Sequence, residues 1–193
     1  MSKKCLGLAL CGSYCTYETL FRAAAPLAEH YDLVPILSDT AAETDSRFGT
    51  AVEHIEKLME LTGKRVVTTI PEAEPLGPAR PMDALLIAPC TGNTLAKLAH
   101  GITDSAVTMA AKAHLRNGRP VVIALSTNDG LSASAENIAR LLNRKHFYFV
   151  PFGQDDPEKK PCSLQADFSL LGDSVSAALQ GKQLQPILVP LRP

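Results

Sequence analysis

Short apolar runs alternate along the chain with longer segments in which apolar residues recur every three or four positions. The short runs predict buried strands, and the longer, periodic segments predict amphipathic helices. We expect strands at residues 4–10, 32–37, 65–70, 83–88, 119–125 and 146–150. We expect helices at residues 15–30, 48–61, 91–100, 104–117, 134–143 and 167–180. This alternation is typical of βαβ crossovers, so it predicts a doubly wound, three-layer α/β/α domain around a mainly parallel sheet.

Prolines modify three of these elements. Pro26 falls inside the first helix and is expected to kink it or end it early. Pro35 falls inside the second strand and is expected to weaken its middle or place it near an edge of the sheet. Residues 71–81 contain four prolines and one glycine and are therefore predicted to be a connection. Residues 153–161 are predicted to be a polar surface loop. The Pro-containing tail, residues 183–193, is expected to lie against a neighbour or hang free.

Length, composition and charge narrow the class of protein. The chain has 193 residues, of which 46% are apolar and 20% charged, as in one ordinary globular domain. The formal net charge is −1 and Trp is absent, which argues against a nucleic-acid-binding protein. No apolar run approaches the roughly 18–20 residues that span a bilayer. The apolar stretch 5–11 follows two lysines but is short for a signal peptide.

The cysteines indicate the compartment. The chain has five of them, an odd number, and they are scattered without a CxxC pair. No Cys/His pair has the spacing of zinc ligands. We therefore expect free thiols, no metal site and a cytoplasmic location.

Small, hydroxyl and amide side chains follow four of the predicted strands. They are Gly12-Ser13-Tyr14, Ser38-Asp39-Thr40, Pro89 to Thr94 and Ser126-Thr127-Asn128. Because ligands bind beyond the carboxyl ends of parallel strands, these loops are expected to lie together. Helix N-termini there would offer free N–H groups, which suits a phosphate joined to a polar heterocycle. The sequence contains neither GxGxxG nor a P-loop, which argues against a standard dinucleotide site and against P-loop nucleotide hydrolysis.

The segment PCTGNT, residues 89–94, resembles the PASANT-type motif of the homo-oligomeric flavin-containing cysteine decarboxylase superfamily. The resemblance implies a flavodoxin/Rossmann-like fold over residues 1–182, bound FMN, and assembly into trimers or dodecamers. In that family the loop after the fourth strand contacts the flavin, and the serine after the second strand contacts the cofactor. The FMN-binding residues that the resemblance implies here are Gly12, Ser13, Tyr14, Ser38, Thr40, Pro89, Cys90, Thr91, Gly92, Asn93, Thr94, Ser126, Thr127 and Asn128.

Two further motifs, STNDGL at 126–131 and VPFGQDDP at 150–157, are similar to those of the dipicolinate synthase B-subunit family. That resemblance implies a flavoprotein subunit that oxidises a dihydrodipicolinate-level intermediate of the lysine pathway to dipicolinate. It also implies a partner, the A subunit of dipicolinate synthase, that carries NAD(P), and a place in the mother-cell cytoplasm of a sporulating bacterium. Because the substrate is a small dicarboxylate, Arg80 and Lys112 are candidate substrate-binding cations by charge.

One departure from the superfamily concerns histidine. The cysteine decarboxylases carry a His shortly before the fourth strand, whereas residues 71–82 contain none. The nearest upstream, His54, is expected on a helix surface, because Val52, Ile55, Leu58 and Met59 form the apolar face of the same helix. His100 and His114 are likewise expected on helix surfaces. This departure argues against decarboxylation. No catalytic base is identified, so a non-catalytic scaffold subunit is one alternative. A second is a prenylating flavoprotein or a phosphopantothenoylcysteine-type decarboxylase of the same superfamily, of which the missing His disfavours the decarboxylase.

Overall fold

A computed structural model describes residues 3–77, 79 and 82–191. Its centre is a seven-stranded sheet in the order β2-β1-β3-β4-β7-β6, with β5 also paired to β4. β1, β2, β3, β4 and β5 are parallel, and β6 and β7 are antiparallel additions at one edge. The strands are β1 (Lys4–Leu10), β2 (Tyr31–Leu37), β3 (Ala84–Cys90), β4 (Val121–Thr127), β5 (Phe147–Phe149), β6 (Phe152–Gly153) and β7 (Leu164–Ala166). The predicted mainly parallel α/β domain is confirmed.

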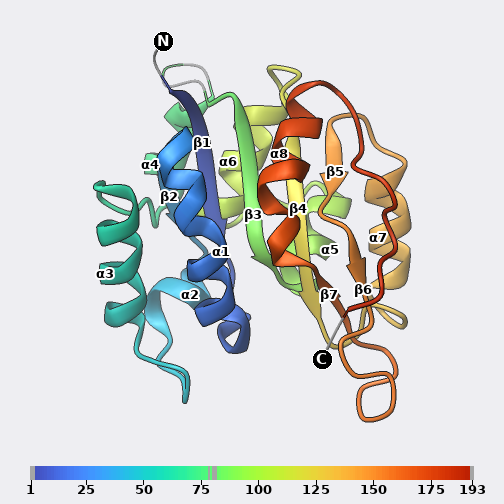
Figure 1. Ribbon diagram of the computed structural model, residues 1–193. Coiled ribbons are helices and arrows are strands. Elements are labelled where there is room, and N and C mark those ends of the chain that lie inside the picture. The colour runs from blue at the N-terminus through green and yellow to red at the C-terminus, as the bar shows by residue number, and fades with distance from the viewer. Residues whose placement is uncertain (1–2, 78, 80–81, 192–193) are drawn as a thin grey trace.

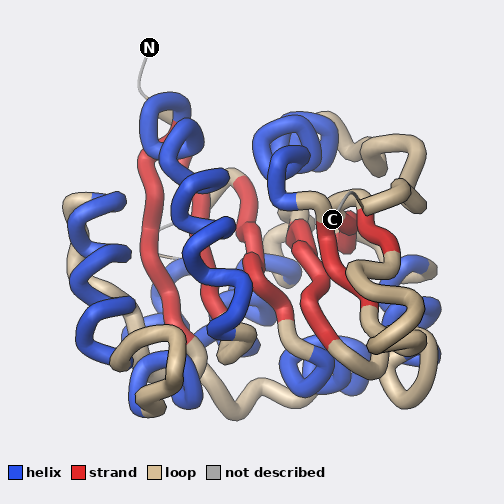
Figure 2. The backbone as a smooth tube through the Cα atoms, turned by 60° about the horizontal axis from the view of Figure 1, so that its bottom comes forward, coloured by secondary structure: helices blue, strands red, loops and turns tan. Residues whose placement is uncertain are grey.

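Helices cover both faces of the sheet. α1 and α8 lie in front of the strands in Figure 1, and α5 and α6 lie behind them, while Figure 2 shows the same layers from another side. The α-helices are α1 (Tyr17–His30), α2 (Asp39–Glu43), α3 (Ala51–Thr62), α4 (Ile70–Ala73), α5 (Gly92–His100), α6 (Ala106–Leu115), α7 (Ala135–Leu142) and α8 (Leu171–Leu179). The 3-10 turns are η1 (Tyr14–Thr16), η2 (Glu74–Leu76) and η3 (Phe168–Leu170). Every residue of β3 is buried, as expected for a central parallel strand.

The strand predicted at residues 65–70 is wrong. Val67 makes one isolated parallel bridge to Ile36, and the segment then turns into α4. Thr69 caps α4, accepting a hydrogen bond from the Glu72 N–H while the Glu72 carboxylate accepts one from the Thr69 N–H. This capping box favours a helix start over a strand end. The predicted connection at 71–81 is therefore also wrong in part, because it contains most of α4 and all of η2.

The two prolines behave differently. α1 continues through Pro26 to His30, so the expected early end does not occur. β2 is the edge strand of the sheet, as Pro35 predicted. The Pro35 carbonyl accepts from the Val67 N–H, on the side away from β1, so the missing N–H of Pro35 removes no bond to β1.

The end of the chain lies along β6 of the same chain. Phe152 donates to the Ile187 carbonyl and accepts from the Val189 N–H. The Gln183 amide donates to the Phe149 carbonyl and accepts from the Phe149 N–H. Short strands β6 and β7 flank the predicted 153–161 loop, and sequence patterning did not predict them.

Two histidines predicted on helix surfaces are buried. His54 is 1% exposed, because α3 packs through Ala51, His54 and Leu58, whereas Val52 and Met59 face outward. His114 is fully buried, with its Nε2 2.9 Å from the Pro120 carbonyl oxygen. Burial lowers the pKa of His114 to about 4 and also lowers the pKa of His54. His100 is exposed, as predicted.

Candidate functional site

A pocket of about 190 Å³ lies at the carboxyl edge of the sheet, where β1, β2 and β3 end. It is lined by Gly12, Ser38, Asp39, Thr40, Thr91, Asn93, Thr94, Lys97 and Ser105. Three of the four loops predicted from the sequence therefore meet here, as the position of parallel strand ends requires. The lining consists mainly of hydroxyls, with one amide, one ammonium and one carboxylate.

The N-terminus of α5 forms one wall of the pocket. Thr91 caps this helix, and its hydroxyl accepts from the Thr94 N–H at 3.4 Å. The Thr91 carbonyl accepts from the Leu95 N–H. The N–H groups of Gly92 and Asn93 belong to the first turn and have no partner inside the helix. The wall therefore presents backbone donors and the positive end of a helix dipole, which favour an anion.

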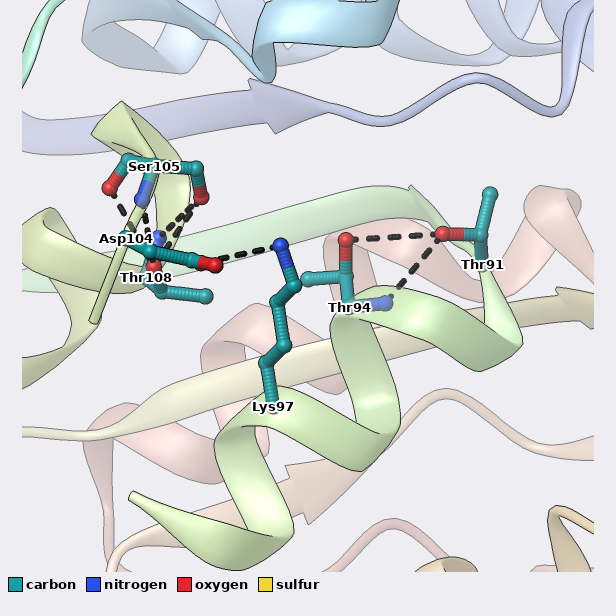
Figure 3. Close-up of polar contacts among 6 residues, drawn as sticks. All are labelled: Thr91, Thr94, Lys97, Asp104, Ser105 and Thr108. Atoms are coloured by element: carbon teal, nitrogen blue, oxygen red, sulfur yellow. Dashed lines mark hydrogen bonds and ion pairs between the residues drawn. The ribbon is translucent and has the colours of Figure 1, made fainter. Parts of the chain in front are cut away.

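Lys97 supplies the positive charge of the pocket. It lies one turn along α5 from Asn93, and its Nζ is 2.9 Å from Oδ1 of Asp104. Figure 3 shows the Lys97 amine between the Asp104 carboxylate and the side chain of Thr94. The Lys97 ammonium in turn lowers the pKa of Asp104. Asp104 therefore fixes the Lys97 side chain at the pocket wall.

The loop after β4 braces the N-terminus of α5 from the other side. The hydroxyls of Thr127 and Ser134 both donate to Oδ1 of Asp129, at 2.9 Å for Ser134. A Cβ on Gly92 would lie 2.7 Å from the Thr127 Oγ1 and 2.8 Å from the Ser134 Oγ. Only glycine fits here without a shift of these groups. The STNDGL motif thus contributes mainly a support for the PCTGNT loop.

The remaining loop residues lie beside the pocket. The hydroxyls of Ser13 and Ser126 are 2.8 Å apart, which joins the loops after β1 and β4. The Tyr14 hydroxyl donates to the Thr40 carbonyl oxygen at 2.6 Å. Asn128 is exposed, and its Oδ1 accepts from the Ser163 hydroxyl at 3.4 Å.

Two predicted positions are the last residues of β3 rather than a loop. The Pro89 carbonyl accepts from the Cys11 N–H, and Cys90 is fully buried. Burial raises the pKa of the Cys90 thiol well above its usual value and that of Cys11 to about 11. Both thiols are therefore neutral core groups at pH 7, and all five cysteines are free.

The two predicted substrate cations do not join this pocket. Lys112 is exposed in the last turn of α6, at the opposite end of that helix from Ser105, which lines the pocket. Arg80 lies outside the described residues. Among the residues that the structure does describe, no group of His, Cys, Asp and Glu could hold a metal ion. In the same part of the chain, no helix is long and apolar enough to cross a membrane.

Sequence reasoning missed Lys97, Ser105, Asp104, Asp129 and Ser134. Lys97 was detectable in principle, because it follows Asn93 by four residues and so shares its helix face. The other four depend on how separate loops return to the same place. Two larger hollows, of about 780 and 840 Å³, lie elsewhere, and neither is lined by the loops that follow β1, β2 and β3.

Comparisons with known proteins found a matching family model and relatives that are similar in sequence and structure. The model of the Flavoprotein family matches residues 1–174. The dipicolinate synthase B subunit of Bacillus subtilis (strain 168) is 47% identical over 187 residues, which cover 96% of this chain and 94% of that protein. The crystal structure of the dipicolinate synthase B subunit from Bacillus halodurans C has a TM-score of 0.89 at 44% identity and covers 97% of this chain and 96% of its own.

A more distant structure shows the shared fold alone. It is the FMN-dependent cysteine decarboxylase SpaF, with a TM-score of 0.65 at 21% identity, covering 92% of this chain and 97% of that one. The family model and the two close relatives span nearly the whole chain. The chain therefore belongs to the Flavoprotein family and, within it, to the family of dipicolinate synthase B subunits.

Proposed function

We propose that this chain is the FMN-binding subunit of a dipicolinate synthase and takes part in oxidising a dihydrodipicolinate-level dicarboxylate to dipicolinate. The observation that carries the proposal is the pocket at the carboxyl edge, in which one ammonium, several hydroxyls and a helix N-terminus converge. The 47% identity to a dipicolinate synthase B subunit supports the choice of substrate.

The donor set of the pocket fits the phosphate and polyol of FMN. Within the described part of the chain, the Thr40 hydroxyl and the Asn93 amide donate to no other protein group, so both are available to a ligand. The volume of about 190 Å³ is below the roughly 300–1,000 Å³ of ligand pockets that enclose a whole drug-sized molecule. The pocket therefore suits the phosphate end of FMN, and the ring system would extend beyond it.

Each residue has a defined task in this proposal. Lys97 and the first-turn N–H groups of α5 would neutralise the phosphate, and Ser38, Thr40 and Asn93 would hydrogen-bond its oxygens or the polyol. Asp39 at the rim would accept hydrogen bonds from polyol hydroxyls. FMN, when bound, supplies an acceptor for the two electrons that leave the dihydropyridine ring. The chain's own residues would hold and orient FMN.

An exposed apolar stripe on and before α3 supports assembly into a homo-oligomer. Phe48, Val52 and Met59 are 45%, 62% and 43% exposed. A second copy packed against this stripe would lie near α2 and would cover a flavin ring that extends out of the pocket.

We propose that the chain forms a trimer or dodecamer, which analytical ultracentrifugation measures. We also propose that it acts in the cytoplasm of a sporulating mother cell. The dehydrogenase A subunit, which would hold NAD(P), is the proposed partner.

Reconstitution tests the proposed reaction. The purified chain, the A subunit, FMN and NAD(P) are combined with the dihydrodipicolinate-level substrate, and dipicolinate formation is followed by ultraviolet absorbance. We expect full activity only with both subunits and FMN present, and reduced activity with Asn93→Ala. Equal activity with and without FMN would favour the scaffold alternative, in which this chain assists the A subunit without its own redox step. Release of CO₂ from the substrate would indicate a decarboxylase instead.

A further inference from the structure

His54 is buried beside the candidate site without a hydrogen-bond partner. It is 1% exposed, and neither ring nitrogen has a partner among the described residues. Burying both nitrogens without a partner costs free energy in this conformation, because their hydration is lost without replacement. A phenylalanine or leucine would fill the same space at no such cost. The position therefore needs an explanation beyond packing.

Two tyrosines and a glycine enclose the imidazole. The Tyr14 ring is stacked on it, with centroids 6.0 Å apart and planes 19° apart, and the Tyr17 ring meets it edge-on at 4.6 Å. Gly49, at φ +128°, lies so close that a Cβ there would be 2.8 Å from the His54 Cε1. The Tyr17 hydroxyl is engaged with the Cys11 carbonyl oxygen, at 2.9 Å. The Tyr17 side chain is therefore held in place.

Tyr14 is the wall that separates His54 from the pocket. Its hydroxyl donates to the Thr40 carbonyl oxygen, and a Cβ on Gly12 would be 3.4 Å from that hydroxyl. Gly12 and Thr40 both line the pocket. The Tyr14 ring is half-buried in η1, a three-residue turn, and that one hydrogen bond is the only one its hydroxyl makes within the described chain. Rotation of the Tyr14 side chain would break this hydrogen bond and uncover the face of the His54 ring on which Tyr14 is stacked.

We propose that His54 is a latent anion-binding residue of the site, covered by Tyr14 in this conformation and available to an anionic oxygen of a bound ligand when the Tyr14 ring turns aside. This inference rests on the proposed function for the identity of the ligand. The oxygen belongs either to the FMN phosphate or to a carboxylate of the dicarboxylate substrate. The His54 ring donates an N–H to it.

Paired titrations distinguish the two sources. His54→Phe keeps the ring volume and removes both nitrogens, and His30→Phe on the exposed end of α1 is the matched control. We expect His54→Phe to bind FMN or dipicolinate about tenfold more weakly than wild type. Riboflavin, which lacks the phosphate, should bind His54→Phe as it binds wild type. If His54→Phe loses affinity for FMN alone, the oxygen that His54 contacts belongs to the phosphate. If it loses affinity for dipicolinate alone, that oxygen belongs to the carboxylate. Unchanged binding of both, or an equal loss of FMN and riboflavin, overturns the proposal.

Removing the Tyr14 ring that covers His54 gives a test that is independent of FMN. Tyr14→Ala should bind inorganic phosphate or dipicolinate more tightly than wild type, and Tyr14→Ala/His54→Phe should lose that gain. The same gain in both variants overturns the proposal. If His54→Phe does not fold, the ring resonances of His54 in the wild-type protein provide the measurement. They should shift on addition of phosphate or dipicolinate, and their invariance overturns the proposal. Absence of FMN binding by wild type would refute the proposed function without deciding the role of His54.

Discussion

Gly92→Ala tests whether the loop after β4 positions the pocket wall. The added Cβ would lie 2.7 Å from the Thr127 Oγ1, 2.8 Å from the Ser134 Oγ and 2.9 Å from the Asp129 Oδ1. Real Cβ contacts are essentially never so short, so either α5 or the loop has to move. The two hydroxyls both donate to Asp129, the third group, so none of the three can move away freely. The strain therefore falls on the start of α5, where Asn93 begins the pocket wall.

The expected cost follows from overpacking. An extra methyl in a filled space destabilises a protein by about 1–3 kcal/mol. The gain in helix propensity from Gly to Ala, at most ~1 kcal/mol, offsets part of this. A net loss of about 1–2 kcal/mol corresponds to a fall in Tm of roughly 2–8 °C for a domain of this size. Because the Gly92 and Asn93 N–H groups shift together, FMN affinity should fall as well.

Gly172→Ala is the matched control. Gly172 also lies in the first turn of a helix, α8, but the nearest atom to an added Cβ is 3.7 Å away. This variant should be as stable as wild type or more stable, with unchanged FMN affinity. Calorimetry gives Tm, and fluorescence titration gives the affinity. The reasoning is refuted if Gly92→Ala matches Gly172→Ala in both measurements.

Three further changes have separate expected results. Asp129→Ala leaves the Thr127 and Ser134 hydroxyls without their acceptor, so chemical denaturation should show a free energy of unfolding that is lower by about 1–3 kcal/mol. An unchanged denaturation midpoint would contradict the proposed support of α5 by the loop after β4. Lys97→Met should weaken FMN binding by about 1.5–3 kcal/mol, whereas riboflavin, which has no phosphate, should bind as before. The free energy of unfolding should change by less than ~1 kcal/mol, because the Lys97–Asp104 ion pair is partly exposed. His114 has a pKa of about 4 in the folded chain against 6.5 unfolded, so the unfolded chain binds more protons between these values. The free energy of unfolding should therefore fall by roughly 3 kcal/mol as pH drops from 6.5 toward 4. If His114→Gln shows the same pH dependence of stability as wild type, His114 is not the group responsible.

The sequence predicted the strongly periodic parts of the fold. Buried strands such as Ala84–Cys90 have continuous apolar runs, and their alternation with helices admits few arrangements. The segment 65–70 was mispredicted because its β-branched residues favour a strand, while tertiary structure gives it a single bridge and a capped helix start. The T-x-x-E pattern of that capping box, Thr69 to Glu72, is a sequence signal for a helix start at this position.

The candidate site was predictable only as far as strand ends define it. Residues after β1, β2 and β3 meet because parallel strands end at one edge. Asp104 and Asp129 reach the site through loop conformations that periodicity does not encode. His54 was missed because α3 offers two faces about 150° apart, one through Val52 and Met59 and one through His54. Periodicity favours burial of the more apolar face, whereas the structure buries the face with the histidine.

Titration of the purified wild-type chain with FMN, followed by flavin fluorescence, tests the central claim most directly. Asn93→Ala serves as the comparison, because its exposed amide faces the pocket without a role in the core. We expect saturable quenching at micromolar FMN, with binding to Asn93→Ala weaker by roughly 1–3 kcal/mol. A folded wild-type protein that binds no FMN, or equal affinity of the two proteins, would contradict the assignment of this pocket as the flavin site.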